Sequence, residues 1–234
     1  MSKAYLTIDD GPTKNTKKIV DFLVSKNIPS IMFFTGENIL KYREEAIYAL
    51  KKGVIIGNHS FTHVPFSQIT LKKDICEIES QEKQLDLLYK EAKVTRKYKI
   101  FRFPYGDKGG KNKKSLQSYL KYEKFNKFNS SKIKYHWYFK EGLDKDIDVY
   151  WTFDFIEYKL EYNVGFTFND IFYEINDKNP NSGGVLLDPS SYNIVLIHDH
   201  EKSEEVYPDY FSKIIDYTLK SGVKYMKPKF ITSN

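Results

Sequence analysis

The hexapeptide TIDDGP at Thr7–Pro12 is the segment from which the rest of this chain can be interpreted. The apolar residues 4–8 predict a buried strand, and the Gly-Pro pair predicts a sharp turn directly after it. Its two adjacent carboxylates, Asp9 and Asp10, point in different directions, so one can bind a metal ion while the other accepts a proton. Taken alone, an Asp-Asp-Gly-Pro sequence is also typical of an ordinary turn. The residues that accompany it decide between these interpretations.

Helix-like and strand-like segments alternate along the chain of 234 residues. This alternation predicts an α/β fold with a parallel sheet and crossover helices. The length fits a single domain over 1–234, with insertions or long loops near 107–146 and 160–191. We expect helices at 14–26, 44–52, 71–89 and 203–220, and strands at 4–8, 30–35, 54–57, 100–103, 148–153 and 194–197.

Chemically active residues follow the predicted strands, at the point where each strand ends. A parallel barrel gathers the carboxyl ends of its strands on one face, so residues far apart in sequence are expected to meet there. The residues concerned are Asp9, Asp10, His59, Arg102, Tyr105, Asp154, Glu157 and His198.

His59 and His63 form a close histidine pair in the sequence HSFTH. The glutamate of the H-E-x-x-H zinc proteases is absent because Ser60 occupies its position, so the general base must come from elsewhere. With Asp10, the two histidines make a ligand set that leaves positions open for water and substrate, as catalytic zinc sites do. Asp9 is then available as the base.

Two further segments carry candidate catalytic groups. Arg102 can hold an ionised base by a charge-assisted hydrogen bond, and the Pro-Tyr-Gly turn after it can aim a backbone N–H into the site. His198 ends a buried apolar run and can protonate a leaving amine if a carboxylate supports it. Glu157 is the candidate for that carboxylate, and a purely structural histidine is the alternative for His198.

These segments, in this order, resemble the NodB-type polysaccharide deacetylases of carbohydrate esterase family 4. Thr7–Pro12 matches the T-F-D-D-G-P motif with Ile8 in place of Phe, and 59–63 matches H-[ST]-x-x-H. The segments 102–106 and 196–199 match R-x-P-[YF]-G and L-x-H-D. The resemblance runs from about residue 5 to residue 199 and implies a distorted (β/α) barrel, TIM-like but with fewer regular strands.

The resemblance also implies a role for each matching residue. Asp9 would be the general base and His198 the general acid. One divalent metal ion, zinc most often and cobalt or nickel as alternatives, would be bound by Asp10, His59 and His63. Arg102 would orient Asp9, the backbone N–H of Tyr105 would stabilise the oxyanion, and Leu196 would line the acetyl pocket together with Pro104 and Tyr158.

The fourth motif departs from the family pattern. The family shows D-S-x-D-W where this chain has DFIEY at 154–158. Glu157 stands where the aspartate that supports the acid histidine would be, and Tyr158 stands where the pocket tryptophan would be. These changes raise the alternative that the scaffold acts on another substrate.

Composition limits the classes of binding partner and the cellular compartments that we expect for this chain. The net charge of +6 comes from dispersed lysines, so no basic surface stripe that would bind nucleic acid is predicted. The single Cys76 excludes an intrachain disulfide. No apolar run is long enough to span a bilayer and no signal peptide precedes the first strand. We therefore expect a cytoplasmic protein, or an exported one whose leader is absent from this sequence; no feature specifies an oligomeric state.

The function we expect is metal-dependent hydrolysis of N-acetyl groups from an aminosugar polymer or oligomer, such as peptidoglycan or a chitin-like chain. One alternative is the same scaffold acting on another small amide, an imide or an acetyl ester. A second alternative is an inactive carbohydrate-binding protein, against which the full set of Asp, His and Arg residues argues.

Overall fold

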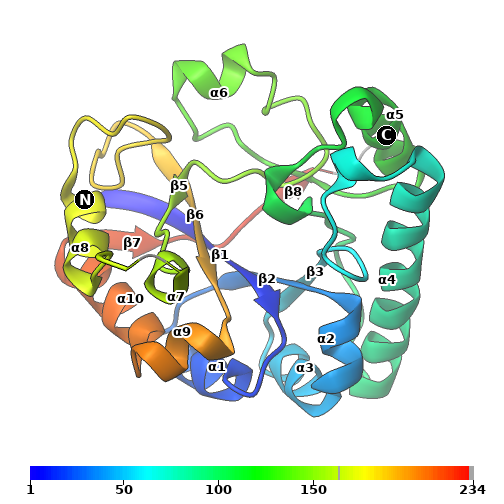
Figure 1. Ribbon diagram of the computed structural model, residues 1–234, viewed down its shortest axis with the longest axis horizontal. Coiled ribbons are helices and arrows are strands. Elements are labelled where there is room, and N and C mark those ends of the chain that lie inside the picture. Colours follow the sequence, from blue (N-terminus) through cyan, green and yellow to red (C-terminus); the bar gives the residue numbers. More distant parts are fainter. Residues whose placement is uncertain (163, 232–234) are drawn as a thin grey trace.

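The computed structural model describes residues 1–162 and 164–231, and a parallel sheet around β1 (Ser2–Gly11) forms its centre (Figure 1). Residue 163 of the second predicted insertion, and 232–234 of the predicted domain, lie outside the described residues. The strand order is β3-β2-β1-β6-β5, all parallel, and β7 pairs with the start of β1. The predicted parallel α/β fold is confirmed. The other strands are β2 (Ser30–Phe34), β3 (Ile55–Asn58), β5 (Phe153–Asp154), β6 (Tyr192–His198) and β7 (Val223–Tyr225).

Irregular segments bridge the gap between the outer strands β3 and β5. The predicted strand at 100–103 is wrong: Phe101 makes only an isolated bridge to Asn58, because the short η2 turn (Pro104–Gly106) follows at once. The backbone N–H of Val149 in turn donates to the Phe101 carbonyl oxygen at 2.9 Å. Single hydrogen bonds therefore continue the sheet where strands are missing, which gives the distorted barrel that we predicted.

The predicted strand at 148–153 is correct only at its end, where β5 begins. The segment changes partner before a regular ladder can form. The N–H of Val149 bonds to Phe101, whereas the N–H of Thr152 bonds to the Ile194 carbonyl at 2.8 Å. This change of partner places residues 149–152 between the two ends of the sheet.

Helices surround the strands (Figure 1). Three of the predicted helices are confirmed with small shifts in their ends, as α1 (Thr16–Ser25), α3 (Arg43–Lys51) and α4 (Leu71–Ala92). The predicted helix at 203–220 is instead two helices, α9 (Glu201–Val206) and α10 (Tyr210–Lys220). They are separated because Pro208 lacks an N–H and Asp209 has a left-handed backbone with φ 64°.

The remaining elements lie in segments for which the sequence predicted no regular structure. The short helix α2 starts after Thr35, whose hydroxyl accepts a hydrogen bond from the N–H of Asn38 as a helix cap. Together, these remaining elements fall mostly in the two predicted insertions. They are α2 (Gly36–Lys41), η1 (Phe66–Gln68), η3 (Gly110–Asn112), α5 (Lys113–Tyr122), β4 (Lys127–Phe128), α6 (His136–Lys140), α7 (Lys159–Tyr162), α8 (Phe168–Asn176) and β8 (Phe230–Ile231).

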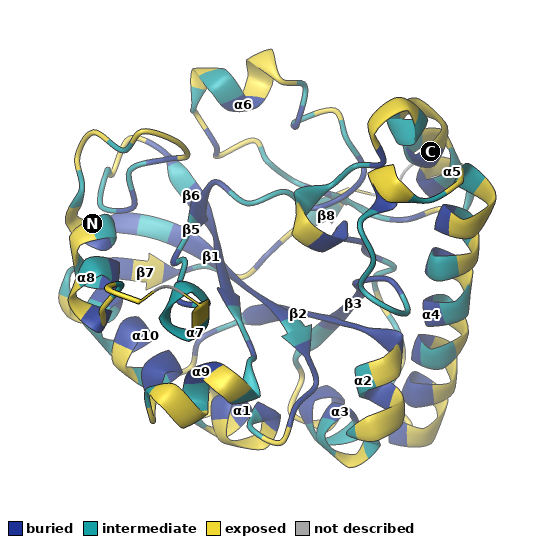
Figure 2. Ribbon diagram, in the orientation of Figure 1, coloured by how far each residue is buried: buried dark blue, intermediate teal, exposed yellow. Residues whose placement is uncertain are grey.

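The core lies on both faces of the sheet, which appear as buried strands in Figure 2. Leu6 and Ile8 of β1 pack with the outer helices, whereas Tyr5 packs on the opposite face. Phe128 and Tyr138 from the first predicted insertion belong to that inner cluster. The segment 107–146 is therefore part of the barrel core and more than a surface loop.

Among the described helices, none combines the length and the apolar character needed to cross a bilayer.

Candidate metal centre and catalytic residues

β1 presents Asp9 and Asp10 to the same cavity because its regular pairing breaks near its end. The register with β2 shifts between Ile8 and Gly11, and Asp10 has φ 67°. On a regular strand, adjacent side chains point to opposite faces. The bulge turns Asp10 toward the cavity that Asp9 already lines, so the carboxylates share one site from different directions.

His59 and His63 lie in a tight loop after β3. Ser60 and His63 both have left-handed backbones, with φ 64° and 59°, a conformation that costs energy for residues other than glycine. Two consecutive loop amides donate to the Glu77 carboxylate of α4 at 3.0 Å and 2.7 Å. Asn58 accepts a further bond from the Ser60 N–H at 2.8 Å. Polar contacts with α4 and β3 thus hold the loop in its strained shape.

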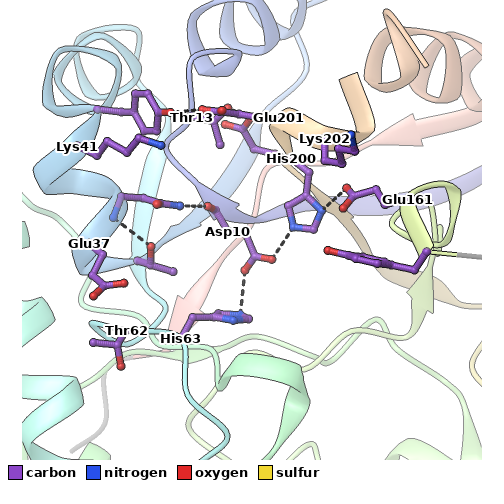
Figure 3. A pocket seen from close by; sticks show the side chains of 15 residues that line it. Asp10, Thr13, Glu37, Lys41, Thr62, His63, Glu161, His200, Glu201 and Lys202 are labelled. Carbon is purple, nitrogen blue, oxygen red and sulfur yellow. Dashed lines mark hydrogen bonds and ion pairs between the residues drawn. The ribbon is translucent and has the colours of Figure 1, made fainter. Parts of the chain in front are cut away.

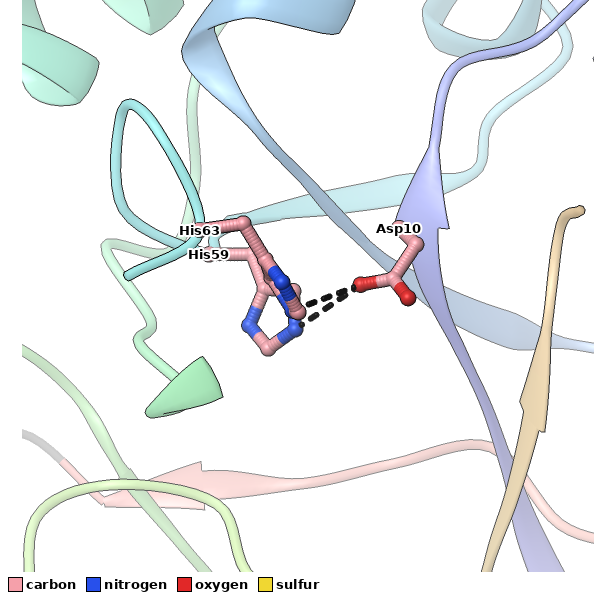
Figure 4. A group of neighbouring side chains, drawn as sticks. All are labelled: Asp10, His59 and His63. Atoms are coloured by element: carbon pink, nitrogen blue, oxygen red, sulfur yellow. Dashed lines mark ion pairs between the residues drawn. The ribbon is translucent and has the colours of Figure 1, made fainter. Parts of the chain in front are cut away.

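Asp10, His59 and His63 converge so that one ligand atom from each lies within 4.8 Å of the others (Figure 4). Nδ1 of His59 lies 2.8 Å from the Arg102 carbonyl oxygen and must donate to it, so the neutral ring leaves its Nε2 lone pair free. Oδ1 of Asp10 is buried, 3.3 Å from that Nε2 and 3.0 Å from Nε2 of His63, without an aligned hydrogen bond. Three electron-rich atoms that face one another fit a divalent cation.

The electrostatics of this cluster favour an ionised Asp10. Burial by itself would raise its pKa, but His63, His200 and His59 hold the pKa of Asp10 well below its usual range. The carboxylate therefore carries its negative charge at neutral pH, as a metal ligand must.

Arg102 holds Asp9 in a buried pair beside the cluster. Nη1 of Arg102 donates a hydrogen bond to Oδ1 of Asp9 at 2.8 Å and another to the Thr7 hydroxyl at 2.7 Å. The arginine is fully buried, with its guanidinium 4.5 Å from the centre of the Phe33 ring. Oδ2 of Asp9 stays free of the arginine and lies 3.5 Å from Nε2 of His59. Asp9 therefore turns one oxygen toward the cluster.

His198 faces Asp9 from the neighbouring strand, because β1 and β6 pair in a register that sets these residues side by side. Nδ1 of His198 lies 2.8 Å from Oε1 of Glu157, which also accepts the His198 backbone N–H at 2.6 Å. Burial opposes protonation of His198, but the Glu157 carboxylate outweighs it and raises the pKa of His198 to about 9. The ring is thus kept as a proton donor at neutral pH.

His200 is a site residue that we did not predict. Its Nε2 donates to Oδ2 of Asp10 at 2.8 Å and its Nδ1 to Oε1 of Glu161 at 3.1 Å (Figure 3). Burial would lower the pKa of His200, but the two carboxylates raise it to about 10. The pKa of Glu161 falls to about 2, since His200 and Ser203 outweigh the effect of burial. In the sequence, its position two residues after His198 was the only available signal.

These groups open into one cavity of about 440 Å³, lined by Asp9, Asp10, His59, His63, Tyr105, Trp151, Asp154, Tyr158, Tyr162, Leu196, His198 and His200. Tyr105 has φ 57° and its exposed ring lies 4.5 Å from that of His63. Leu196 and Tyr158 are among the lining residues. Pro104 is not among them, because η2 buries it and exposes Tyr105 in its place. Arg102 and Glu157 lie behind Asp9 and His198.

Two further cavities adjoin the first. One, of about 340 Å³, shares Asp10, His63, Tyr162 and His200 with it (Figure 3). The other, of about 1140 Å³, shares Trp151 and Asp154 and extends between the two predicted insertions. The cavity lined by Asp10, His59 and His63 therefore shares lining residues with both of the others.

Comparison with known proteins places this site in context. The family model described as polysaccharide deacetylase matches residues 2–124. A peptidoglycan-N-acetylglucosamine deacetylase of Bacillus cereus is 32% identical over 107 residues, which are 45% of this chain and 37% of that protein. Chitin deacetylase 2 of Saccharomyces cerevisiae is 32% identical over 105 residues, 45% of this chain and 31% of that protein. The matches thus span about a third of each relative.

The fold comparison covers more of the chain. The crystal structure of a polysaccharide deacetylase from Bacillus cereus superposes with a TM-score of 0.64 at 18% identity, over 97% of this chain and 92% of that one. At this identity the likeness concerns the fold, which extends beyond residue 124 to the half of the chain that the family model does not match.

Proposed function

Because this chain belongs to the polysaccharide deacetylase family, we propose that it hydrolyses the acetamido group of an N-acetylated aminosugar chain to a free amine and acetate. The observation that carries the proposal is the convergence of three groups on one cavity. These are the Asp10–His59–His63 cluster, the Asp9–Arg102 pair and the His198–Glu157 pair.

Asp9 is the proposed general base. It accepts a proton from water as the water oxygen bonds to the acetyl carbon, and Arg102 keeps the carboxylate in position. His198, protonated through its contact with Glu157, gives its proton to the nitrogen as the carbon–nitrogen bond breaks. The backbone N–H of Tyr105 stabilises charge on the acyl oxygen, and Leu196 with Tyr158 lines the acetyl pocket.

Asp10, His59 and His63 would hold the metal ion, for which zinc is our choice because of the two-nitrogen, one-oxygen donor set. When bound, such an ion acidifies water and polarises the acetyl carbonyl.

The adjoining cavities support an oligomeric or polymeric substrate rather than a small amide. A pocket for a small molecule is typically closed around it. Here the cluster lies between two adjoining cavities, and Trp137, Tyr150 and Tyr173 line the larger one. Aromatic faces of this kind can pack against the apolar faces of sugar rings on either side of the reacting one.

The proposal is tested by acetate release from N-acetylglucosamine oligomers and from peptidoglycan, with added zinc or cobalt and with chelator. We expect release that needs the metal. Asp9→Asn should lower turnover by a factor of about 10² to 10⁴, the usual contribution of a general base.

Asp86→Asn is the matched control, since Asp86 is largely exposed on α4 and lines none of the three cavities. Turnover of Asp9→Asn at the unsubstituted level would remove Asp9 from its role. No acetate from any glycan, by protein that binds one metal ion per chain, would overturn the substrate class.

A further inference from the structure

The geometry points to His200, together with Glu161, as a positioning pair that fixes the Asp10 carboxylate for binding the metal through one oxygen. This inference rests on the proposed function, because it assigns a role toward the same metal centre. Neither residue belongs to the ligand cluster itself, which consists of Asp10, His59 and His63.

The two oxygens of Asp10 face different partners. Oδ2 accepts the hydrogen bond from Nε2 of His200 at 2.8 Å. Oδ1 is the oxygen that faces His59 and His63, at 3.3 Å and 3.0 Å from their Nε2 atoms. The hydrogen bond from His200 thus fixes the carboxylate with Oδ1 directed between the two histidines, where a cation would bind (Figures 3 and 4).

His200 is itself held by a second carboxylate. Its Nδ1 lies 3.1 Å from Oε1 of Glu161, and the Ser203 hydroxyl donates to the same oxygen at 2.6 Å. The Glu161 side chain is only 3% exposed, and that of His200 is 23% exposed. The imidazole therefore has a fixed orientation, with both nitrogens directed at carboxylate oxygens.

The backbone of Asp10 gives a reason for such support. Its φ of 67° lies in the left-handed region, where a non-glycine residue is strained. Nδ2 of Asn38 donates to the Asp10 carbonyl oxygen at 2.6 Å, which holds the backbone. His200 holds the side chain, and partners of this kind typically account for a 10- to 100-fold difference in metal affinity (order of magnitude).

The test is zinc affinity of the metal-free full chain, measured by competition with a chromophoric chelator and independent of catalysis. We expect His200→Ala to weaken zinc binding by roughly 10- to 100-fold. His200→Gln should retain most of the affinity, because its amide N–H can occupy the position of Nε2 and donate to Asp10. Glu161→Ala should give a loss smaller than that of His200→Ala, since it frees His200 without removing it.

His136→Ala is the matched control, because His136 is an exposed histidine on α6 outside the three cavities. Zinc affinity of His200→Ala equal to that of the unsubstituted chain would overturn the inference and leave the proposed metal centre standing. An equal loss in His200→Ala and His200→Gln would also overturn it, as the hydrogen bond would not be the cause. Failure of the unsubstituted chain to bind zinc would instead overturn the metal centre, and this inference with it.

Discussion

At the scale of single residues, buried neighbours of opposite charge set the protonation of several groups in the site. His198 is the clearest case. Oε1 of Glu157 receives both its ring and its backbone N–H, and Glu157 is itself fully buried. The Glu157 carboxylate raises the pKa of His198 to about 9 against the effect of burial. A proton donor must be protonated to act, so activity should fall as the pH rises through that value.

Glu157→Gln should move this alkaline limit to lower pH. The substitution removes the negative charge that raises the pKa of His198 and leaves the burial that lowers it, so the limit should fall by about 1 to 3 pH units. The measurement is the pH profile of kcat/KM for acetate release. Glu44→Gln, at an exposed position on α3, is the control. An alkaline limit that does not move in Glu157→Gln would show that His198 is not the acid.

At the scale of secondary-structure elements, α4 holds in place the loop that carries His59 and His63. Glu77 accepts two loop amides and the Thr62 hydroxyl, the last at 3.0 Å. Nδ2 of Asn58 donates to the Ile78 carbonyl and to Glu82, at 3.0 Å and 2.9 Å. The helix thus fixes both the end of β3 and the loop that carries His59 and His63.

Glu77→Ala should weaken the fold and the metal site together. It leaves two loop amides and a hydroxyl without their charged acceptor, which should lower the free energy of unfolding by about 1.5 to 3 kcal/mol. Zinc affinity should fall as well, because the strained loop is released. Chemical denaturation and zinc competition measure the two effects.

Glu79→Ala on the same helix is the control, as Glu79 contacts the Tyr119 hydroxyl outside the site. If Glu77→Ala lost stability but bound zinc with unchanged affinity, the loop would hold its shape without the Glu77 contacts.

At the scale of the whole molecule, the two predicted insertions contribute more than half of the residues that line the largest of these three cavities. Residues from 137–141 and from 173–183 line the cavity of about 1140 Å³ beside the site. Tyr173 of α8 is 72% exposed there, so its ring is available to a ligand. We expect a long glycan to reach this region and a disaccharide bound at the Asp10–His59–His63 cluster to stop short of it.

Tyr173→Ala should therefore affect long substrates selectively. We expect KM for an N-acetylglucosamine hexamer to rise roughly fivefold, which corresponds to the loss of about 1 kcal/mol of aromatic packing. KM for the dimer should be unchanged. Tyr122→Ala is the control, since Tyr122 is 80% exposed and lines none of the three cavities. Equal changes in KM for dimer and hexamer would exclude this region as a sugar-binding site.

Much of the fold could be predicted from local pattern. Burial of an apolar run and helical spacing are properties of neighbouring residues, which is why β1, β2, α1 and α4 match the sequence closely. Prediction failed where the pairing partner of a segment, and not its own residues, decides whether the segment forms a strand. Residues 100–103 have the apolar character of a strand, yet η2 leaves them a single bridge. The helix predicted at 203–220 is interrupted because Pro208 lacks the N–H that a continuous helix needs.

The sequence by itself determined the kinds of groups at the site and their likeness to a family, because the motifs are short and contiguous. Only the tertiary structure decided how they meet. Asp10 and His200 are 190 positions apart and form a hydrogen bond; Glu161 reaches the same histidine from a segment with no recognisable motif. Such contacts depend on the path of the whole chain and on the bulge that turns Asp10. Neither is encoded in the spacing of nearby residues.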